Sequence, residues 1–340
     1  SHIGMKALLY YTAFCDTDVI TRSVKIINEG TQAFYLTKVL SACLDMDNQD
    51  YEMISLHGSW ARERHIQRKK VGYGIQKVSS FRGESSHQDH PFLALVSPNT
   101  TQEMGEVYAM NFVYSGNFQA QAEVSQFDSI RMSMGIHPEN FCWKLERGES
   151  FQAPEVVMVY SSQGLDGMTT AFHHLYKRHL IRGEYKDKKR PILINNWEAT
   201  YFNFTTEKLL SIAKEASGLG IEMLVMDDGW FGARSSDNCA LGDWQVNEEK
   251  LPGGLKYLVD EVNKLGMKFG IWFEPEMISP DSDLYRAHPD WAIAIPGRVA
   301  TESRQQYVLD LSRQEVVDYV YECVAKILRS ANIEYVKWDM

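Results

Sequence analysis

The sequence predicts a β domain followed by an α/β part, the first half of a (β/α)8 TIM barrel. Residues 1–163 carry many short strand patterns and hardly any helical period, which is typical of a β-sandwich. From Pro191 onward apolar strands alternate with amphipathic helices, as in the βαβ units of a parallel sheet. We therefore expect a β domain at 1–163, a helical linker at 164–190 and the barrel part at 191–340.

The strands of the first domain are predicted by alternating apolar and polar residues. The alternation is clearest at residues 19–26, 108–114 and 118–136, and turn-forming clusters at 45–48 and 97–100 separate these segments. The linker contains a helical segment at 168–180.

Four apolar runs in the second half predict four buried parallel strands. They lie at residues 192–194, 224–226, 269–273 and 335–336, and each is followed or ended by a carboxylate close to a tryptophan. Barrels carry their chemistry at the carboxyl ends of such strands, and indole faces stack on sugar rings, so these residues predict a sugar site. The tryptophans of this predicted rim are Trp197, Trp230, Trp244, Trp272 and Trp338.

Three helices are expected between the four strands. Apolar stripes at 209–219 and 255–265 predict the first two, and a capping box from Ser312 to Glu315 predicts the start of the third. A closed barrel needs eight strands and eight helices in about 250 residues, so the roughly 150 residues present predict half a barrel.

Composition excludes several classes of protein. The formal charge of −10 and the lack of a clustered basic stripe argue against a nucleic-acid partner. No apolar stretch reaches the roughly 18 residues of a membrane helix. Five scattered cysteines without a C-x-x-C pair predict free thiols, and with no signal-peptide segment at the start we expect a cytoplasmic protein.

Asp339 is the best candidate for a nucleophile. Lys337 lies two positions earlier on the same strand, so both side chains point to the same face. A neighbouring ammonium favours the ionised form of a carboxylate, which suits a nucleophile and does not suit a general acid. A structural salt bridge at the strand end is an equally good interpretation from spacing alone.

Asp227 and Asp228 end the second strand, where each could accept a hydrogen bond from a different sugar hydroxyl. A helix cap and a divalent-metal pair are the alternatives, but no further ligands converge nearby, so we expect no metal. Arg304 could donate to sugar oxygens or to Asp339, or be an ordinary surface arginine.

The ordered motifs of this chain resemble those of glycoside hydrolase family 36, the bacterial α-galactosidases. They are HGSWARER at 57–64, NNWEAT at 195–200, MDDGWFG at 226–232, LGDW at 241–244, GIWFEPEM at 270–277, HPDW at 288–291 and VKWDM at 336–340.

This resemblance implies retaining hydrolysis of terminal α-galactosyl residues in small oligosaccharides of the melibiose and raffinose type. It implies Asp339 as nucleophile, no metal or organic cofactor, an N-terminal β-supersandwich and possible homo-oligomers. The positions that match the family's galactose pocket are Trp197, Asp227, Asp228, Trp272, Arg304 and Lys337.

One departure from the family pattern changes the expectation for this chain. The family's acid/base aspartate follows the nucleophile strand, whereas here only Met340 follows Asp339. We therefore expect this segment alone to be inactive. The rival interpretations are an α-N-acetylgalactosaminidase or galactosyl transferase of the same fold, a non-catalytic sugar-binding fragment, and a metal-dependent barrel hydrolase.

Overall fold

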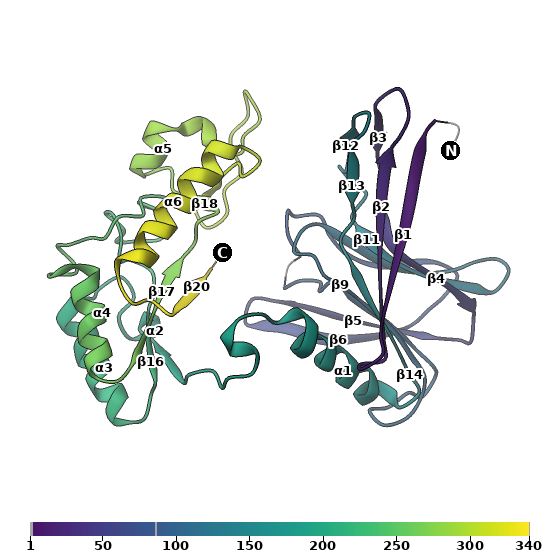
Figure 1. Cartoon of the computed structure of the whole chain (residues 1–340), viewed down its shortest axis with the longest axis horizontal. Coiled ribbons are helices and arrows are strands. Elements are labelled where there is room, and N and C mark those ends of the chain that lie inside the picture. Colours follow the sequence, from purple (N-terminus) through teal and green to yellow (C-terminus); the bar gives the residue numbers. More distant parts are fainter. Residues whose placement is uncertain (1–2, 86, 340) are drawn as a thin grey trace. The chain divides into compact units, whose positions relative to one another are not determined.

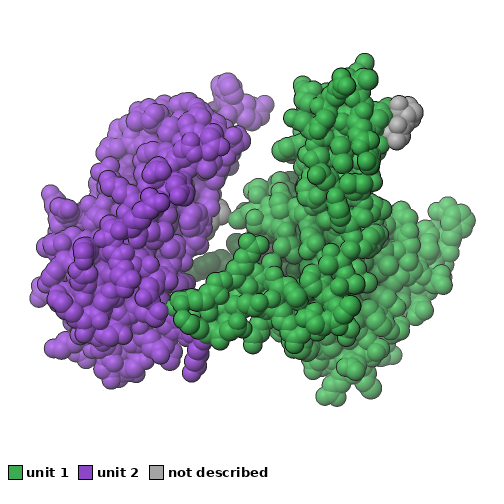
Figure 2. All heavy atoms as spheres, in the orientation of Figure 1, with its two compact units in different colours: residues 1–188 green, residues 189–340 purple. Residues whose placement is uncertain are grey.

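The computed structural model describes residues 3–85 and 87–339, so Met340, the last residue of the VKWDM motif, lies outside the described residues. The chain divides into two compact units, residues 1–188 and 189–340 (Figure 2). The predicted linker at 164–190 falls almost wholly within the first unit, and the three-part domain division stays a prediction.

The first unit is built on an eight-stranded antiparallel sheet (Figure 1). Its strands are, in spatial order, β1 (Met5–Phe14), β2 (Val19–Asn28), β14 (Val156–Ser161), β9 (Val107–Phe112), β8 (Phe92–Val96), β5 (Glu52–Ser59) and β6 (Arg62–Lys70), with β13 (Ser150–Gln152) beside β2.

A second, three-stranded sheet packs on one face of the eight-stranded sheet. It consists of β10 (Phe118–Val124), β11 (Ser129–Ile136) and β4 (Leu40–Asp47). Leu93 and Leu95 of β8 share one buried cluster with Met132 and Met134 of β11, so the two sheets pack face to face as the predicted sandwich. The remaining strands are β7 (Gly74–Ser80) and the pair β3 (Phe34–Leu36) and β12 (Trp143–Leu145).

Helix α1 (Gly164–Leu175) belongs to the first unit. Its buried residues Met168 and Phe172 pack on Val157 and Val159 of β14. The helix continues as a π-helical turn, Tyr176–Leu180, and a 3₁₀ turn, Glu184–Lys186, follows. The predicted helix at 168–180 therefore exists, but its last turn is wider than an α-helix.

The second unit contains four parallel strands in the order β15 (Leu193–Asn195), β16 (Met223–Met226), β17 (Lys268–Phe273) and β20 (Tyr335–Trp338) (Figure 1). Trp272 of β17 is in register with Lys337 of β20. The helices that join the strands are α2 (Trp197–Thr200), α3 (Thr206–Gly218), α4 (Gly254–Lys264), α5 (Asp283–Ala287) and α6 (Gln314–Ser330), with a 3₁₀ turn at Pro289–Trp291 and the short pair β18 (Met277–Ile278) and β19 (Tyr307–Val308).

The predicted capping box at the last helix is wrong. Helix α6 begins at Gln314 with Arg313 as its N-cap, and no side chain caps it. Ser312 donates its hydroxyl to Asp310 instead, and Glu315 pairs with Arg313. The local sequence pattern was present, but an aspartate two residues upstream competed for the serine hydroxyl.

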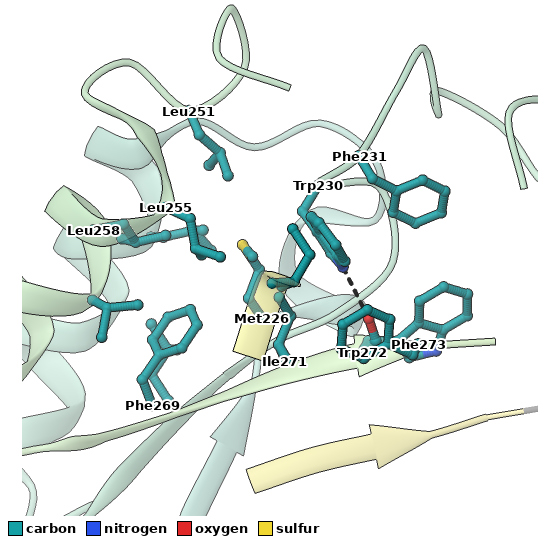
Figure 3. Close-up of a cluster of buried hydrophobic side chains, with 14 of the residues drawn as sticks. Met226, Trp230, Phe231, Leu251, Leu255, Leu258, Phe269, Ile271, Trp272 and Phe273 are labelled. Atoms are coloured by element: carbon teal, nitrogen blue, oxygen red, sulfur yellow. Dashed lines mark hydrogen bonds between the residues drawn. The ribbon is translucent and has the colours of Figure 1, made fainter. Parts of the chain in front are cut away.

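The core of the second unit lies between helix α4 and strands β16 and β17 (Figure 3). Leu255 and Leu258 project from α4 toward Met226, Phe269 and Ile271 of the two strands. The apolar stripe at 255–265 and the continuous apolar strands that predicted this packing are both explained by this shared core.

Two expectations from composition can be compared with the described residues. No helix within them is long and apolar enough to cross a membrane. All five cysteines are described and carry unpaired thiols, as predicted.

Candidate active site

Four predicted site residues meet at the carboxyl ends of three adjacent strands. Asp227 follows β16, Trp272 lies on β17, and Lys337 and Asp339 lie on and after β20. The Lys337 Nζ donates to Asp227 Oδ2 at 2.8 Å and lies 3.7 Å from Asp339 Oδ2. The Trp272 Nε1 donates to the same Asp339 oxygen at 2.9 Å. One ammonium thus bridges two carboxylates at the predicted rim.

The orientation of Asp339 is set by contacts to only one of its oxygens. Trp272 and Lys337 both approach Oδ2, and no hydrogen bond from the described residues reaches Oδ1. The Asp339 backbone N–H donates to Phe273 O at 2.8 Å, which extends the ladder between β17 and β20. The Asp339 side chain is 38% exposed.

Trp272 is itself held by the aromatic core. Its side chain is only 2% exposed, and its backbone carbonyl accepts a hydrogen bond from Trp230 Nε1 at 2.9 Å (Figure 3). Trp230 and Trp244, which the sequence placed at the same rim, are also buried in this aromatic core. Both rings pack on Phe273 because the sheet needs bulky apolar cover there. Trp338 is exposed, and its indole donates to Glu276.

Asp227 is buried and held by two asparagines that sequence reasoning did not single out. Asn195 Nδ2 donates to Asp227 Oδ2 at 2.5 Å, and Asn195 Oδ1 accepts the Trp197 backbone N–H at 2.7 Å. Asn196 Oδ1 accepts the Asp227 backbone N–H at 2.8 Å, and its amide donates to Thr200. Asn195 therefore connects Trp197, a predicted sugar-binding residue, to the carboxylate of Asp227 through hydrogen bonds.

We expect Asn196→Ala to destabilise the second unit by about 2 kcal/mol, because it leaves a buried backbone N–H of the Asp227 turn unpaired. The side chain is fully buried, so water cannot replace the lost acceptor. The urea midpoint followed by tryptophan fluorescence measures the change. Asn332→Ala, which removes an exposed hydrogen bond to Asn263, is the control. Equal effects of the two substitutions would contradict this prediction.

Asp228 lies at the same strand end but points into a buried ion pair. Arg234 Nη2 donates to Asp228 Oδ2 at 2.8 Å and Arg234 Nε to Oδ1 at 3.0 Å, and the arginine side chain is completely buried. Burial raises the pKa of Asp228, and the Arg234 guanidinium opposes that rise. No pattern in the sequence pointed to Arg234, although a buried acid generally requires a cation.

The turn after Asp227 and Asp228 is stabilised by a glycine conformation and by a lysine that binds its backbone. Gly229 adopts φ 101°, a region open to glycine, which lets the chain leave the strand sharply. The Lys250 Nζ donates to the carbonyls of Gly229 and Arg234 and lies 4.8 Å from the centre of the Phe204 ring. Burial lowers the pKa of Lys250. This lysine holds the backbone of the turn.

Arg304 does not join the group around Asp339. Its guanidinium is half exposed and lies 3.9 Å from Glu274 Oε1 and 3.7 Å from Asp237 Oδ1. Of the two acceptors that the sequence suggested for Arg304, Asp339 is therefore not its ion-pair partner in the described structure. Glu274, whose carboxyl is 1% exposed, was also missed by sequence reasoning.

The geometry offers a carboxylate with one oxygen free of hydrogen bonds from the described residues, beside an ammonium and a second, buried carboxylate. Such a group can attack an electrophilic carbon, while the second carboxylate accepts hydrogen bonds from hydroxyl groups. Among residues 3–85 and 87–339, no group of three or more His, Cys, Asp or Glu side chains is arranged to hold a metal ion.

Two family models match the chain. Residues 150–340 match the melibiase model, and residues 1–146 match the glycosyl hydrolase family 36 N-terminal domain. α-Galactosidase AgaA of Geobacillus stearothermophilus is 54% identical over 338 residues, and α-galactosidase Mel36A of Lactobacillus acidophilus is 51% identical over 332 residues. These alignments cover 99% and 98% of this chain but 46% and 45% of the relatives, so the chain spans about half their length.

Solved structures agree with the sequence matches. Crystal structures of AgaA variants from Geobacillus stearothermophilus, one with 1-deoxygalactonojirimycin and one with raffinose, match with a TM-score of 0.98 and 54% identity. Both matches cover 100% of this chain and 47% of the solved chain. The predicted fold, a β domain followed by the first part of the catalytic barrel, is thereby confirmed. The chain belongs to glycoside hydrolase family 36.

Proposed function

We propose that this chain supplies the nucleophile and most of the galactose pocket of a retaining α-galactosidase. The observation that carries the proposal is the Asp339 carboxylate, whose Oδ2 is held by Trp272 and faces Lys337 while Oδ1 accepts no hydrogen bond from the described residues. A fixed carboxylate with one oxygen free of hydrogen bonds is the group that a retaining glycosidase needs for attack on the anomeric carbon.

In the proposed mechanism Asp339 Oδ1 attacks the anomeric carbon from the β face as the α-linked leaving group departs. A covalent galactosyl ester forms, and water then hydrolyses it, so two inversions give net retention. The leaving oxygen needs a proton from a second carboxyl group about 5–5.5 Å from the nucleophile. The family resemblance assigns this acid to an aspartate beyond the nucleophile strand, so we propose the activity for a polypeptide that continues past residue 340.

The remaining predicted residues have proposed roles in the same pocket. Asp227 accepts hydrogen bonds from sugar hydroxyls, and Lys337 holds the two neighbouring carboxylates in position through its contacts to Asp227 Oδ2 and Asp339 Oδ2. Asp228 accepts from a further hydroxyl beside its ion pair with Arg234. Trp197 is proposed to stack on the sugar ring and Arg304 to donate hydrogen bonds to sugar oxygens. Trp272 is proposed to orient the Asp339 carboxylate through its indole N–H.

Relatives indicate the class of substrate. Solved structures of AgaA variants hold raffinose in one case and stachyose in another. We therefore propose terminal α-galactosyl residues of small galacto-oligosaccharides as substrates. We also propose a cytoplasmic location, supported by five unpaired thiols, and self-association, supported only by the family resemblance.

The test compares two polypeptides, this chain and the same chain continued through the second half present in its relatives. We expect the extended form to hydrolyse p-nitrophenyl α-galactoside and the short form to be slower by about 10²–10⁴-fold or more, because it lacks the general acid. Proton NMR of the first product should show α-galactose. An initial β-anomer would establish inversion and refute the proposal. Comparable turnover by the short form would show that the general acid does not lie beyond residue 340.

A further inference from the structure

Glu274 is a buried carboxyl group without a hydrogen-bond partner. It directly follows strand β17 and is 1% exposed, and neither Oε1 nor Oε2 accepts a hydrogen bond from the described residues. Burial raises its pKa to about 7. Glu276, two residues later, accepts the Trp338 indole N–H on one oxygen. An unpaired buried carboxylate is costly, so Glu274 needs a functional or structural reason.

The nearest cation to Glu274 is presented by a strained turn. Arg304 and Gln305 have φ 53° and 62°, and Ser303 and Gln306 exchange backbone hydrogen bonds of 3.1 and 3.0 Å around them. Two consecutive residues with positive φ make a tight hairpin turn that normally uses Asn or Gly. Arginine and glutamine are unusual there, and each such residue costs on the order of 1 kcal/mol or more. The structure retains this turn in spite of the cost, and the turn places the Arg304 guanidinium near Glu274.

Arg304 lies between two carboxylates of different character. Asp237 is about half exposed and 3.7 Å away, whereas Glu274 is buried and 3.9 Å away. Neither distance is a hydrogen bond. Water screens the attraction to Asp237 strongly and the attraction to Glu274 weakly. Glu274 is therefore the partner that can fix the position of the guanidinium.

Resting on the proposed function, we propose that Glu274 is a positioning residue whose carboxylate holds the Arg304 guanidinium in place for the sugar. The charged groups that act on Glu274 are Arg304 and Arg234, which favour its ionised form, and Asp339 and Asp228, which oppose it. The residue touches no reacting atom in this account. It acts through Arg304.

The test is a double-substitution cycle in the extended polypeptide with p-nitrophenyl α-galactoside. We expect Glu274→Gln, which keeps the shape and removes the charge, to raise KM about tenfold while kcat changes less than about threefold. Arg304→Ala should raise KM as well, and adding Glu274→Gln to it should have no further effect. Inhibition by 1-deoxygalactonojirimycin should weaken in parallel with KM.

Two further measurements separate positioning from a merely structural role. Because Glu274 ionises near pH 7, the KM advantage of the wild type over Glu274→Gln should grow from pH 6 to pH 8. Asp237→Asn, which removes the exposed partner, should leave KM within about twofold. If the glutamine variant does not accumulate, Glu274→Leu provides a buried apolar replacement.

Multiplicative effects of the two substitutions, or an unchanged KM in Glu274→Gln, would overturn this inference while leaving the proposed function intact. Absence of turnover by the extended wild type would remove the proposed function and this inference with it.

Discussion

Asp339→Asn is expected to lower kcat on an aryl α-galactoside by about 10⁴-fold or more, the scale on which loss of a nucleophile acts in other enzymes. The amide has the same shape, and its oxygen can still accept the Trp272 indole hydrogen bond, so the fold and the pocket should persist. It has no negative charge, however, and cannot form the galactosyl ester. Steady-state kinetics of the extended polypeptide measure the loss, and calorimetric binding of raffinose checks that the pocket survives.

A second variant tests the direction of attack. Asp339→Gly leaves a hole where the carboxylate stood, and azide should enter it and restore turnover. Because azide attacks from the face that Asp339 occupied, the product should be the β-galactosyl azide. Asp290→Asn, which changes an exposed aspartate paired with Arg313, is the matched control and should keep full activity. Turnover retained by Asp339→Asn, or an α-azide product, would remove Asp339 from the nucleophile role.

Arg234→Met is expected to destabilise the second unit by about 3–5 kcal/mol, because it leaves Asp228 as an uncompensated buried charge. Arg286→Met is the control, since Arg286 also pairs with two aspartates but is more than half exposed. We expect that control to cost less than about 1 kcal/mol. Urea unfolding followed by tryptophan fluorescence compares the two, and similar losses would contradict the buried ion pair.

The loss in Arg234→Met should depend on pH. Burial already raises the pKa of Asp228, and removal of the guanidinium leaves that rise unopposed. A group whose folded pKa is raised stabilises the protonated native state, so stability is lost as pH rises toward the folded pKa. The deficit of the variant should therefore be smaller at pH 5 than at pH 8. Adding Asp228→Asn should recover part of the stability at pH 8, because no buried charge then remains.

The sequence predicted the barrel part well because its signals are local. Buried parallel strands are continuous apolar runs, and the helices between them show a regular apolar stripe, as at Leu255 and Leu258. The sandwich was predicted only as a class. Strand β2 pairs with β14, which follows more than a hundred residues later, and no local pattern specifies such a partner.

The site was predicted where strand geometry alone brings residues together. Lys337 and Asp339 share a face by the period of two, and the parallel register brings both next to Trp272. Arg234, Asn195 and Glu274 were missed because their roles depend on loops folding back onto a strand end. The packing of Trp230 in the aromatic core was not predicted, since sequence does not tell whether an indole at a strand end faces ligand or core.

The pairing of β17 with β20 has a consequence for how Asp339, the proposed nucleophile, reaches its position during folding. Trp272 opposes Lys337, and Asp339 donates its N–H one step beyond that ladder. A slip of one residue would turn Lys337 and Asp339 toward the helices and send Trp338 to the pocket side. Molecules with this shifted register would be nearly as compact but would lack the proposed site. The specific activity of the extended polypeptide should therefore report the fraction of chains in which β17 and β20 have paired in the correct register.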